Sequence, residues 1–320
     1  MKRHLRKWTK LALCLAALLL AAGMVLPAMA ADAPKPDPSG AATGGIADII
    51  GASAGAPTDN DIKTMSEKEP LAAKVADTVG HNRIAINTVW VLVCGFLVMF
   101  MQAGFAMAET GFTRAKNAGH TMAMNFMVYA LGMLGFWLCG YAIQMGGAGP
   151  FPTLGGGAAM NAEFTIKLFG KDFGLFGTQG FFLSGSAYDA AAFSMFLFQM
   201  VFMDTTATIP TGSMAERWTF KSFTVYAILV GAVIYPLYAN WVWGGGWLAK
   251  LGSNFNLGHG HVDFAGSSVV HMTGGVLAFM GAKMLGPRLG KFSKDGTPNA
   301  MPGPHIPMPV VGCFIHAFGW

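Results

Sequence analysis

The sequence predicts an all-α polytopic membrane protein, built as a bundle of transmembrane helices. Of its 320 residues, 53% are hydrophobic and only 12% are charged, about half the charged fraction of a typical soluble domain. The apolar residues also lie in long stretches, and a helix that crosses the hydrocarbon core of a bilayer needs about 20 of them. Composition and spacing therefore both place most of the chain in a membrane.

Five such stretches are present, followed by the beginning of a sixth. Lysine and arginine are concentrated in the loops after the first, third and fifth stretches, and positive charge marks cytoplasmic loops. The mature N-terminus is therefore expected outside. The sixth stretch ends at Trp320 soon after it begins, which predicts a fragment of a longer protein. The predicted spans are 84–108, 119–145, 188–210, 220–242 and 264–286, and the sixth starts near residue 306.

Residues 1–30 have the pattern of a signal peptide. A basic segment, MKRHLRKWTK, precedes the apolar LALCLAALLLAAGMVL, and Ala28-Met29-Ala30 forms a small-residue cleavage site. The alternative is an uncleaved anchor helix, against which Pro27 and the AMA tripeptide argue. A signal peptide and several spans predict a multi-pass protein of a bacterial cytoplasmic membrane. The basic segment carries charges equal to the whole net charge of +5, so no nucleic-acid partner is indicated.

Residues 31–82 are rich in alanine, glycine, proline and aspartate and show no sustained periodicity. We expect this segment to be a flexible extracytoplasmic linker. The membrane domain is then expected to occupy residues 83–320.

Two ionisable residues mark the fifth span. Asp263 lies where the span enters from the outer side, where an aspartate can cap the helix N-terminus. His271 follows eight residues later, about 12 Å deeper and close to the middle of a hydrocarbon core about 30 Å thick. Ionisable groups at this depth are costly and normally face a pore or a partner. The alternative for His271 is a neutral imidazole that hydrogen-bonds two helices together.

Aromatic residues gather near the same end of the bundle. NWVWGGGWL, residues 240–248, lies where the fourth span leaves the membrane, and three glycines free its backbone to present an indole to a vestibule. The face of an indole such as that of Trp243 attracts small cations; the alternative is an interfacial aromatic belt. In the third span, Phe198 and Phe202 share one helix face, which suits either ordinary packing or an aromatic constriction.

Asp204 places a carboxylate in the cytoplasmic half of the third span, about 22 Å along the helix from Asp189. A carboxylate inside the membrane is a functional hypothesis by default. It can pair with a donor on a neighbouring helix, bond to Thr208 one turn along, or tune proton release. We expect structural pairing rather than a proton relay.

Enzyme chemistry is not indicated. The sequence has no nucleophile–base pair, phosphate loop or HExxH zinc spacing. His259 and His261 form an isolated GHGH motif in an outer loop without further ligands, so we predict neither a metal site nor a cofactor.

Several motifs together resemble the ammonium transporter (Amt/Mep/Rh) superfamily. The resemblance extends from about residue 83 to the end of the chain. The motifs are QAGFAMAETGFTRAKN (102–117), FQMVFMDTTATIPTGSMAER (198–217), VWGGGWL (242–248), DFAGSSVVH (263–271) and IPMPVVGCFIHAFGW (306–320).

The resemblance implies the ammonium-transporter fold, with eleven spans in a complete member, of which this chain holds about five and the start of a sixth. It implies that Trp243 and Phe198 belong to an outer site that recruits ammonium, and that Phe202 is one of two gate phenylalanines. Asp263 would shape the vestibule, and His271 would be the first of two pore histidines. The second histidine and the second phenylalanine belong to regions beyond residue 320. The tryptophan favours the Amt branch, whereas Asp204 replaces an uncharged residue of well-known members.

The function implied is ammonium transport, in which ammonium is recruited, deprotonated and passed as ammonia through an apolar pore. Ammonium or ammonia is the expected substrate, a homotrimer the expected assembly and a PII-type protein a cytoplasmic regulator. The alternative is an ammonium sensor that drives a C-terminal signalling domain. Residues after Trp320 would distinguish the two.

Overall fold

The structure, a computed structural model, describes residues 36–41, 43–49, 57–156 and 160–320. The predicted signal peptide, residues 1–30, lies outside these residues. Within them, five helical stretches are long and apolar enough to cross a membrane, and a shorter apolar helix follows. The prediction of a polytopic helical bundle is confirmed. The stretches are Pro70–Phe112, Ala115–Met145, Ala190–Ser213, Phe220–Val242 and Ser267–Leu285, and the shorter helix is Pro307–Gly319.

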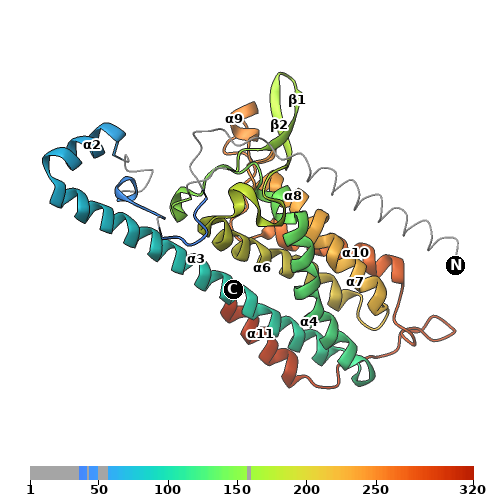
Figure 1. The fold of residues 1–320 in the computed structure, drawn as a ribbon. Helices are drawn as coiled ribbons and strands as arrows, with labels where there is room; N and C mark the ends of the chain where they lie inside the picture. The colour runs from blue at the N-terminus through green and yellow to red at the C-terminus, as the bar shows by residue number, and fades with distance from the viewer. Residues whose placement is uncertain (1–35, 42, 50–56, 157–159) are drawn as a thin grey trace.

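The expectation of a flexible linker over residues 31–82 is wrong for its second half. Helix α2 (Asp59–Lys68) begins with a capping box, in which Thr58 and Asp61 satisfy each other's main-chain N–H groups. Helix α3 (Pro70–Phe112) starts with proline, which suits the first helical position. At 43 residues α3 is about 65 Å long, twice the thickness of a hydrocarbon core. Its first half projects beyond the bundle and carries α2 at its tip (Figure 1).

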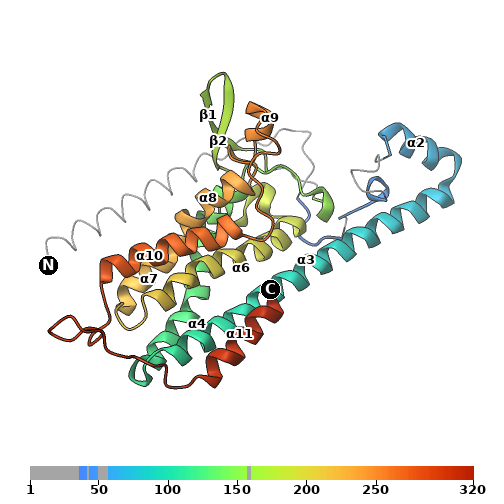
Figure 2. The same ribbon diagram turned by 180° about the vertical axis from the view of Figure 1, so that it is seen from behind.

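The remaining long helices pack into a bundle beside the second half of α3 (Figures 1 and 2). Helices α4 (Ala118–Gly135) and α5 (Tyr141–Met145) are joined by a π-helical turn, and so are α7 (Phe220–Leu229) and α8 (Tyr235–Val242). The other members are α6 (Ala190–Ser213), α10 (Thr273–Leu285) and α11 (Pro307–Gly319). Helix α10 directly follows a π-helical turn, η9 (Ser267–Met272).

Glycines set the closest helix approaches. A side chain at Gly132 or Gly135 would meet α6 or α7, and one at Gly231 would collide with the main chain of Gly132. Helix α11 lies antiparallel to α3, since Gly312 meets Gly104 and Gly319 meets Leu97. Small residues at such crossings let helices approach without a cavity.

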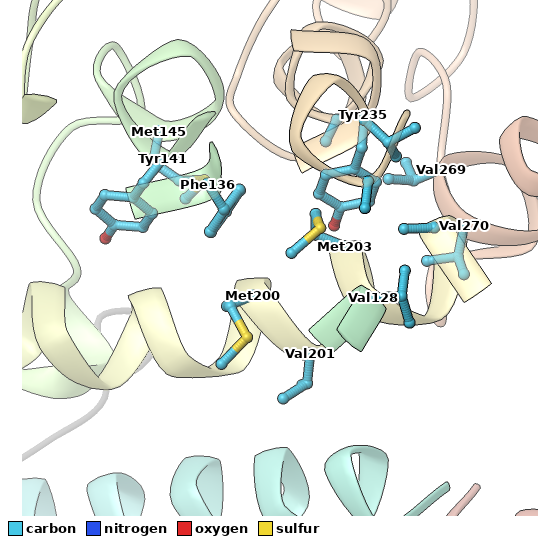
Figure 3. Packing of buried hydrophobic residues seen from close by; sticks show 14 of the residues in the cluster. Val128, Phe136, Tyr141, Met145, Met200, Val201, Met203, Tyr235, Val269 and Val270 are labelled. Carbon is cyan, nitrogen blue, oxygen red and sulfur yellow. The ribbon is translucent and has the colours of Figure 1, made fainter. Parts of the chain in front are cut away.

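The core is a cluster of large side chains between α4, α6, α7 and α8, shown in Figure 3. Phe136 contacts Tyr141 and Tyr235 edge-on, with ring centroids 6.0 and 6.2 Å apart. Met200 and Met203 of α6 are buried in the same cluster. This packing fixes the rotation of α6 and therefore which of its side chains face α10 and which face α3 and α4.

A β-hairpin covers one end of the bundle, which we call the hairpin end. Strand β1 (Glu163–Leu168) pairs antiparallel with β2 (Lys171–Gly177). The two loop residues, Phe169 and Gly170, both have positive φ, as a two-residue hairpin loop requires. This segment lies between the second and third predicted spans of a fold predicted to be all-α, so the hairpin is an addition to the predicted fold.

At the opposite end, Glu216 joins three loops. Its carboxylate forms ion pairs with Arg114, between α3 and α4, and with Arg288, after α10, the latter at 3.3 Å. Burial alone would raise the pKa of Glu216, but the hydrogen bonds and charge of Arg114 and the charge of Arg288 lower it below its ordinary value. The loops at this end are therefore tied together by a retained negative charge.

Candidate functional site

Asp263 organises the segment that leads into the fifth span. Its carboxylate accepts hydrogen bonds from the main-chain N–H groups of residues 266, 267, 268 and 269, at 2.7–2.9 Å. Gly266 makes this wrapping possible because its φ is +98°, which side chains rarely allow. Burial would raise the pKa of Asp263, but the bonds from Val269 and Ser268 outweigh it and lower the pKa to about 2. Asp263 is thus an ionised helix cap.

The three aromatic residues singled out from the sequence lie beside this cap. The Trp243 Nε1–H donates to the main-chain oxygen of Asp263 at 2.7 Å. The Trp243 ring contacts Phe202 edge-on, with centroids 5.5 Å apart, and Phe202 contacts Phe198 in the same way at 5.0 Å. These contacts bring α6, the end of α8 and the Asp263 segment together at the hairpin end. We call Phe198, Phe202 and Trp243 the aromatic cluster.

His271 lies in the π-helical turn η9 that follows the cap. The His271 N–H donates to Gly266 O, five residues earlier, at 2.9 Å, which widens the helix at this point. Such turns occur often at functional sites. The imidazole is partly buried and lies 5.6 Å from the indole of Trp320 between ring centroids. It therefore faces the space between α10 and α11.

A second histidine that the sequence analysis gave no role is close by. His316 of α11 contacts Trp320 at 6.4 Å and Phe105 of α3 edge-on at 4.4 Å. The His271 and His316 rings thus flank one indole. The sequence contained a signal for His316, because this residue lies in the motif IPMPVVGCFIHAFGW at the start of the sixth span.

Asp204 does not join the aromatic cluster. It is about 200° around α6 from Phe202, and only 1% of its surface is exposed. Its Oδ1 has no hydrogen-bond partner among the described residues. Thr208 donates to Gln102 instead, at 3.0 Å. The bond to Thr208 considered for Asp204 is therefore not formed, because that hydroxyl donates to α3. Structural pairing of Asp204 with another helix stays a prediction.

A polar group that the sequence analysis missed lies further along the same interface. Glu109 of α3 accepts from Asn125 Nδ2 of α4 at 2.6 Å and from Thr211 Oγ1 of α6 at 2.7 Å. Gln102 Nε2 donates to Asn125 O at 2.7 Å. Because these side chains satisfy one another, they act as an interhelical clamp away from the aromatic cluster.

The two histidines of the GHGH motif do not converge on a common ligand. His261 Nε2 lies 2.9 Å from Ser268 Oγ, which also donates to Asp263 at 2.7 Å. Within the described residues no group of three or more histidine, cysteine, aspartate or glutamate side chains could hold a metal ion. His261 is therefore part of the capped segment.

The membrane-spanning part of the chain matches a known family in sequence. A sequence model of the Ammonium Transporter Family matches residues 89–320. The chain belongs to the ammonium transporter family. The sequence resemblance is therefore confirmed over residues 89–320.

Relatives of this family member are found in archaea and plants. It is 45% identical over 252 residues to ammonium transporter Amt2 of Archaeoglobus fulgidus, covering 77% of this chain and 48% of the relative. It is 35% identical to ammonium transporter 1 member 3 of Solanum lycopersicum, covering 74% of this chain and 46% of the relative. The chain spans about half the length of these curated relatives.

Solved structures share the fold. One titled "Sensor Amt Protein" has a TM-score of 0.61 and 34% identity, covering 74% of this chain and 53% of the other. Candida albicans Mep2 has a TM-score of 0.54 at 24% identity, covering 73% and 46%, which supports the fold alone. The ammonium-transporter bundle is thus shown independently by sequence and by structure.

Proposed function

We propose that the whole protein transports ammonium across a membrane. The observation that carries this proposal is the joining of Trp243, Phe202 and the Asp263 cap at the start of the helix that bears His271. Family membership supports the substrate, since the relatives are named ammonium transporters. The proposed function is transport. The one chemical change proposed for the substrate is the loss of a proton from ammonium.

The chemistry of the site suits selection of ammonium over potassium. The two ions have similar radii, so size does not separate them, and a cation–π contact with Trp243 and Phe198 gathers either. Ammonium alone can give up a proton and continue as neutral ammonia. The phenylalanine Phe202 then closes the site toward an apolar path. A neutral imidazole at His271 offers one donor and one acceptor to ammonia.

Orientation and assembly belong to the same proposal. The hairpin end faces outside, since the basic residues of the short loops lie at the opposite end. We place the protein in a bacterial cytoplasmic membrane, after cleavage of residues 1–30, as a homotrimer. A cytoplasmic PII-type regulator would act at the end that carries Glu216.

A second function is an ammonium sensor. It is favoured by one observation, the 34% identity to the structure titled "Sensor Amt Protein". In a sensor the same outer site binds ammonium but the signal passes to another domain. Binding without flux would distinguish it from a transporter.

The test is reconstitution of the full-length protein in liposomes. We expect a saturable response to an ammonium gradient and none to an equal potassium gradient. Ammonium binding without any flux would replace transport by sensing. Absence of both binding and flux in a folded protein would contradict the proposal.

A further inference from the structure

The β-hairpin carries an acid that touches the end of α8. Glu163, the first residue of β1, accepts a hydrogen bond through Oε2 from Asn240 Nδ2 at 3.1 Å. Asn240 is completely buried, and its Nδ2 also donates to Gln144 O at 3.1 Å. The contact joins two segments that are 77 residues apart in the chain.

The other oxygen of each side chain is unsatisfied within the part of the chain that the structure describes. Glu163 Oε1 and Asn240 Oδ1 are both buried and make no hydrogen bond among the described residues. An unsatisfied buried oxygen is costly, and two acceptors cannot satisfy each other. A proton on Glu163 Oε1 would change this: Oε2 of the same carboxyl group already accepts from the Asn240 amide, so the new O–H would be placed to donate to Asn240 Oδ1. One proton thereby satisfies both atoms and closes a two-bond acid–amide pair.

The surroundings of Glu163 favour the neutral acid. Its carboxyl group fits against Gly147 and Gly174, where an added side chain would collide with it. Burial raises the pKa of Glu163 to about 7, while the Asn240 hydrogen bond and the charge of Lys250 lower it only in part. Lys250, just before α9 (Leu251–Phe255), is the charged group that acts on this carboxyl from a neighbouring element. Protonation is therefore expected near neutral pH.

The pair lies where the hairpin holds the tryptophan segment. Trp241 Nε1 donates to Leu175 O at 2.9 Å, and Trp247 N donates to Gly174 O at 3.0 Å. Trp243 lies between these two tryptophans in the chain. Because β1 pairs with β2, and β2 is bonded on both sides of Trp243, a shift of β1 would act on the residue that contacts Asp263.

We propose that Glu163 and Asn240 bind one proton between them and that this proton fastens the hairpin to the segment carrying Trp243. Loss of the proton to water leaves a carboxylate beside the Asn240 side chain and returns Asn240 Oδ1 to its unsatisfied state, and the hairpin then loosens. The site would make the hairpin end sensitive to the pH outside the membrane. Its effect on ammonium recruitment rests on the proposed function, whereas the proton site itself does not.

The test compares Glu163→Gln with the wild type in the full-length protein. The side-chain amide introduced by this substitution would donate to Asn240 Oδ1 at every pH. Because the folded protein holds the proton more tightly than the unfolded chain, wild-type stability should fall as the pH rises from about 4.5 to 7. We expect Glu163 to contribute a drop of roughly 2–4 °C in Tm over this range, so the Tm of E163Q should fall by that much less than the Tm of the wild type. Asp172→Asn, on the exposed part of the same hairpin, should keep the wild-type profile.

Infrared spectroscopy gives a second measurement that is independent of stability. At a pH of about 6 the wild type should show a protonated-carboxyl band that titrates near pH 7 and is missing from E163Q. A wild-type-minus-E163Q difference spectrum without this band, or a Tm profile that E163Q leaves unchanged, would overturn the proposal. If ammonium flux failed while the band titrated as expected, only the link to recruitment would be lost.

Discussion

The indole N–H of Trp243 donates to the main-chain oxygen of Asp263 at 2.7 Å. This bond fixes the ring at the junction of α8 and the capped segment, and the ring in turn contacts Phe202. An interfacial tryptophan needs no such tertiary bond, since the headgroup region already accommodates it. The bond therefore supports a positioned indole face rather than an aromatic belt alone.

Trp243→Leu should weaken recruitment of ammonium. The cation–π contact contributes about 0.5–2 kcal/mol, so the apparent affinity should fall by roughly 2- to 30-fold. The measurement is the ammonium dependence of flux in liposomes. Trp90→Leu is the matched control, because Trp90 is 72% exposed on α3. An affinity equally reduced in both variants would contradict the assignment of Trp243.

Asp263→Asn should destabilise the protein by about 2–4 kcal/mol. In the wild type, main-chain N–H groups donate to the carboxylate. In the variant, the NH₂ group of asparagine would face some of these donors and could not accept their hydrogen bonds. Thermal unfolding in detergent measures the loss, and Asp295→Asn in an exposed loop is the control. Wild-type stability in the Asp263→Asn variant would show that the cap is unimportant.

The contribution of Asp263 should also have a defined pH range. Its pKa is lowered from 3.8 to about 2, so the ionised form is favoured in the folded state. The stability it supplies is complete above about pH 4 and is lost as the pH falls toward about 2. Between about pH 5 and 8, the difference between the free energies of unfolding of the wild type and of Asp263→Asn should therefore stay constant.

Asp204→Asn should leave stability within about 1 kcal/mol of the wild type. Since Asp204 Oδ1 has no hydrogen-bond partner among the described residues, the change breaks no bond at that atom. Thr211→Val is the contrasting variant, because it removes the hydroxyl that lies 2.9 and 2.7 Å from the two carboxyl oxygens of Glu109 and should be destabilising. A large loss of stability in Asp204→Asn would restore a structural role, and intact folding with altered flux would give Asp204 a part in transport.

The spans could be predicted from the sequence because the signal is local. Apolar length alone located five helices, and the end of the fourth span at Val242 was predicted to the residue. The start of α3 was not predicted. Residues 70–83 are too polar to be recognised as part of a span, yet they form the first turns of the helix. Thr58 and Pro70 were the available signals, and both are start signals of helices.

The site could be predicted only in part. Asp263 was singled out because an acid where a span enters the membrane is uncommon in an apolar chain. Trp243, Phe198 and Phe202 were singled out because they stand in the motifs that resemble the family. The Glu163–Asn240 contact could not be found, since nothing local relates residues 77 positions apart. The Thr208 bond considered for Asp204 is absent for a similar reason, because Gln102 of another helix takes the Thr208 hydroxyl.

The most direct test of the central claim is ammonium flux through the full-length protein with and without the His271 imidazole. His271→Leu should abolish flux while leaving the ammonium affinity of the outer site, read from tryptophan fluorescence, within about 2-fold of the wild type. Met272→Leu, on the more exposed side of the same turn, should conduct normally. Unchanged flux in His271→Leu would contradict a path for ammonia along the helix that Asp263 caps.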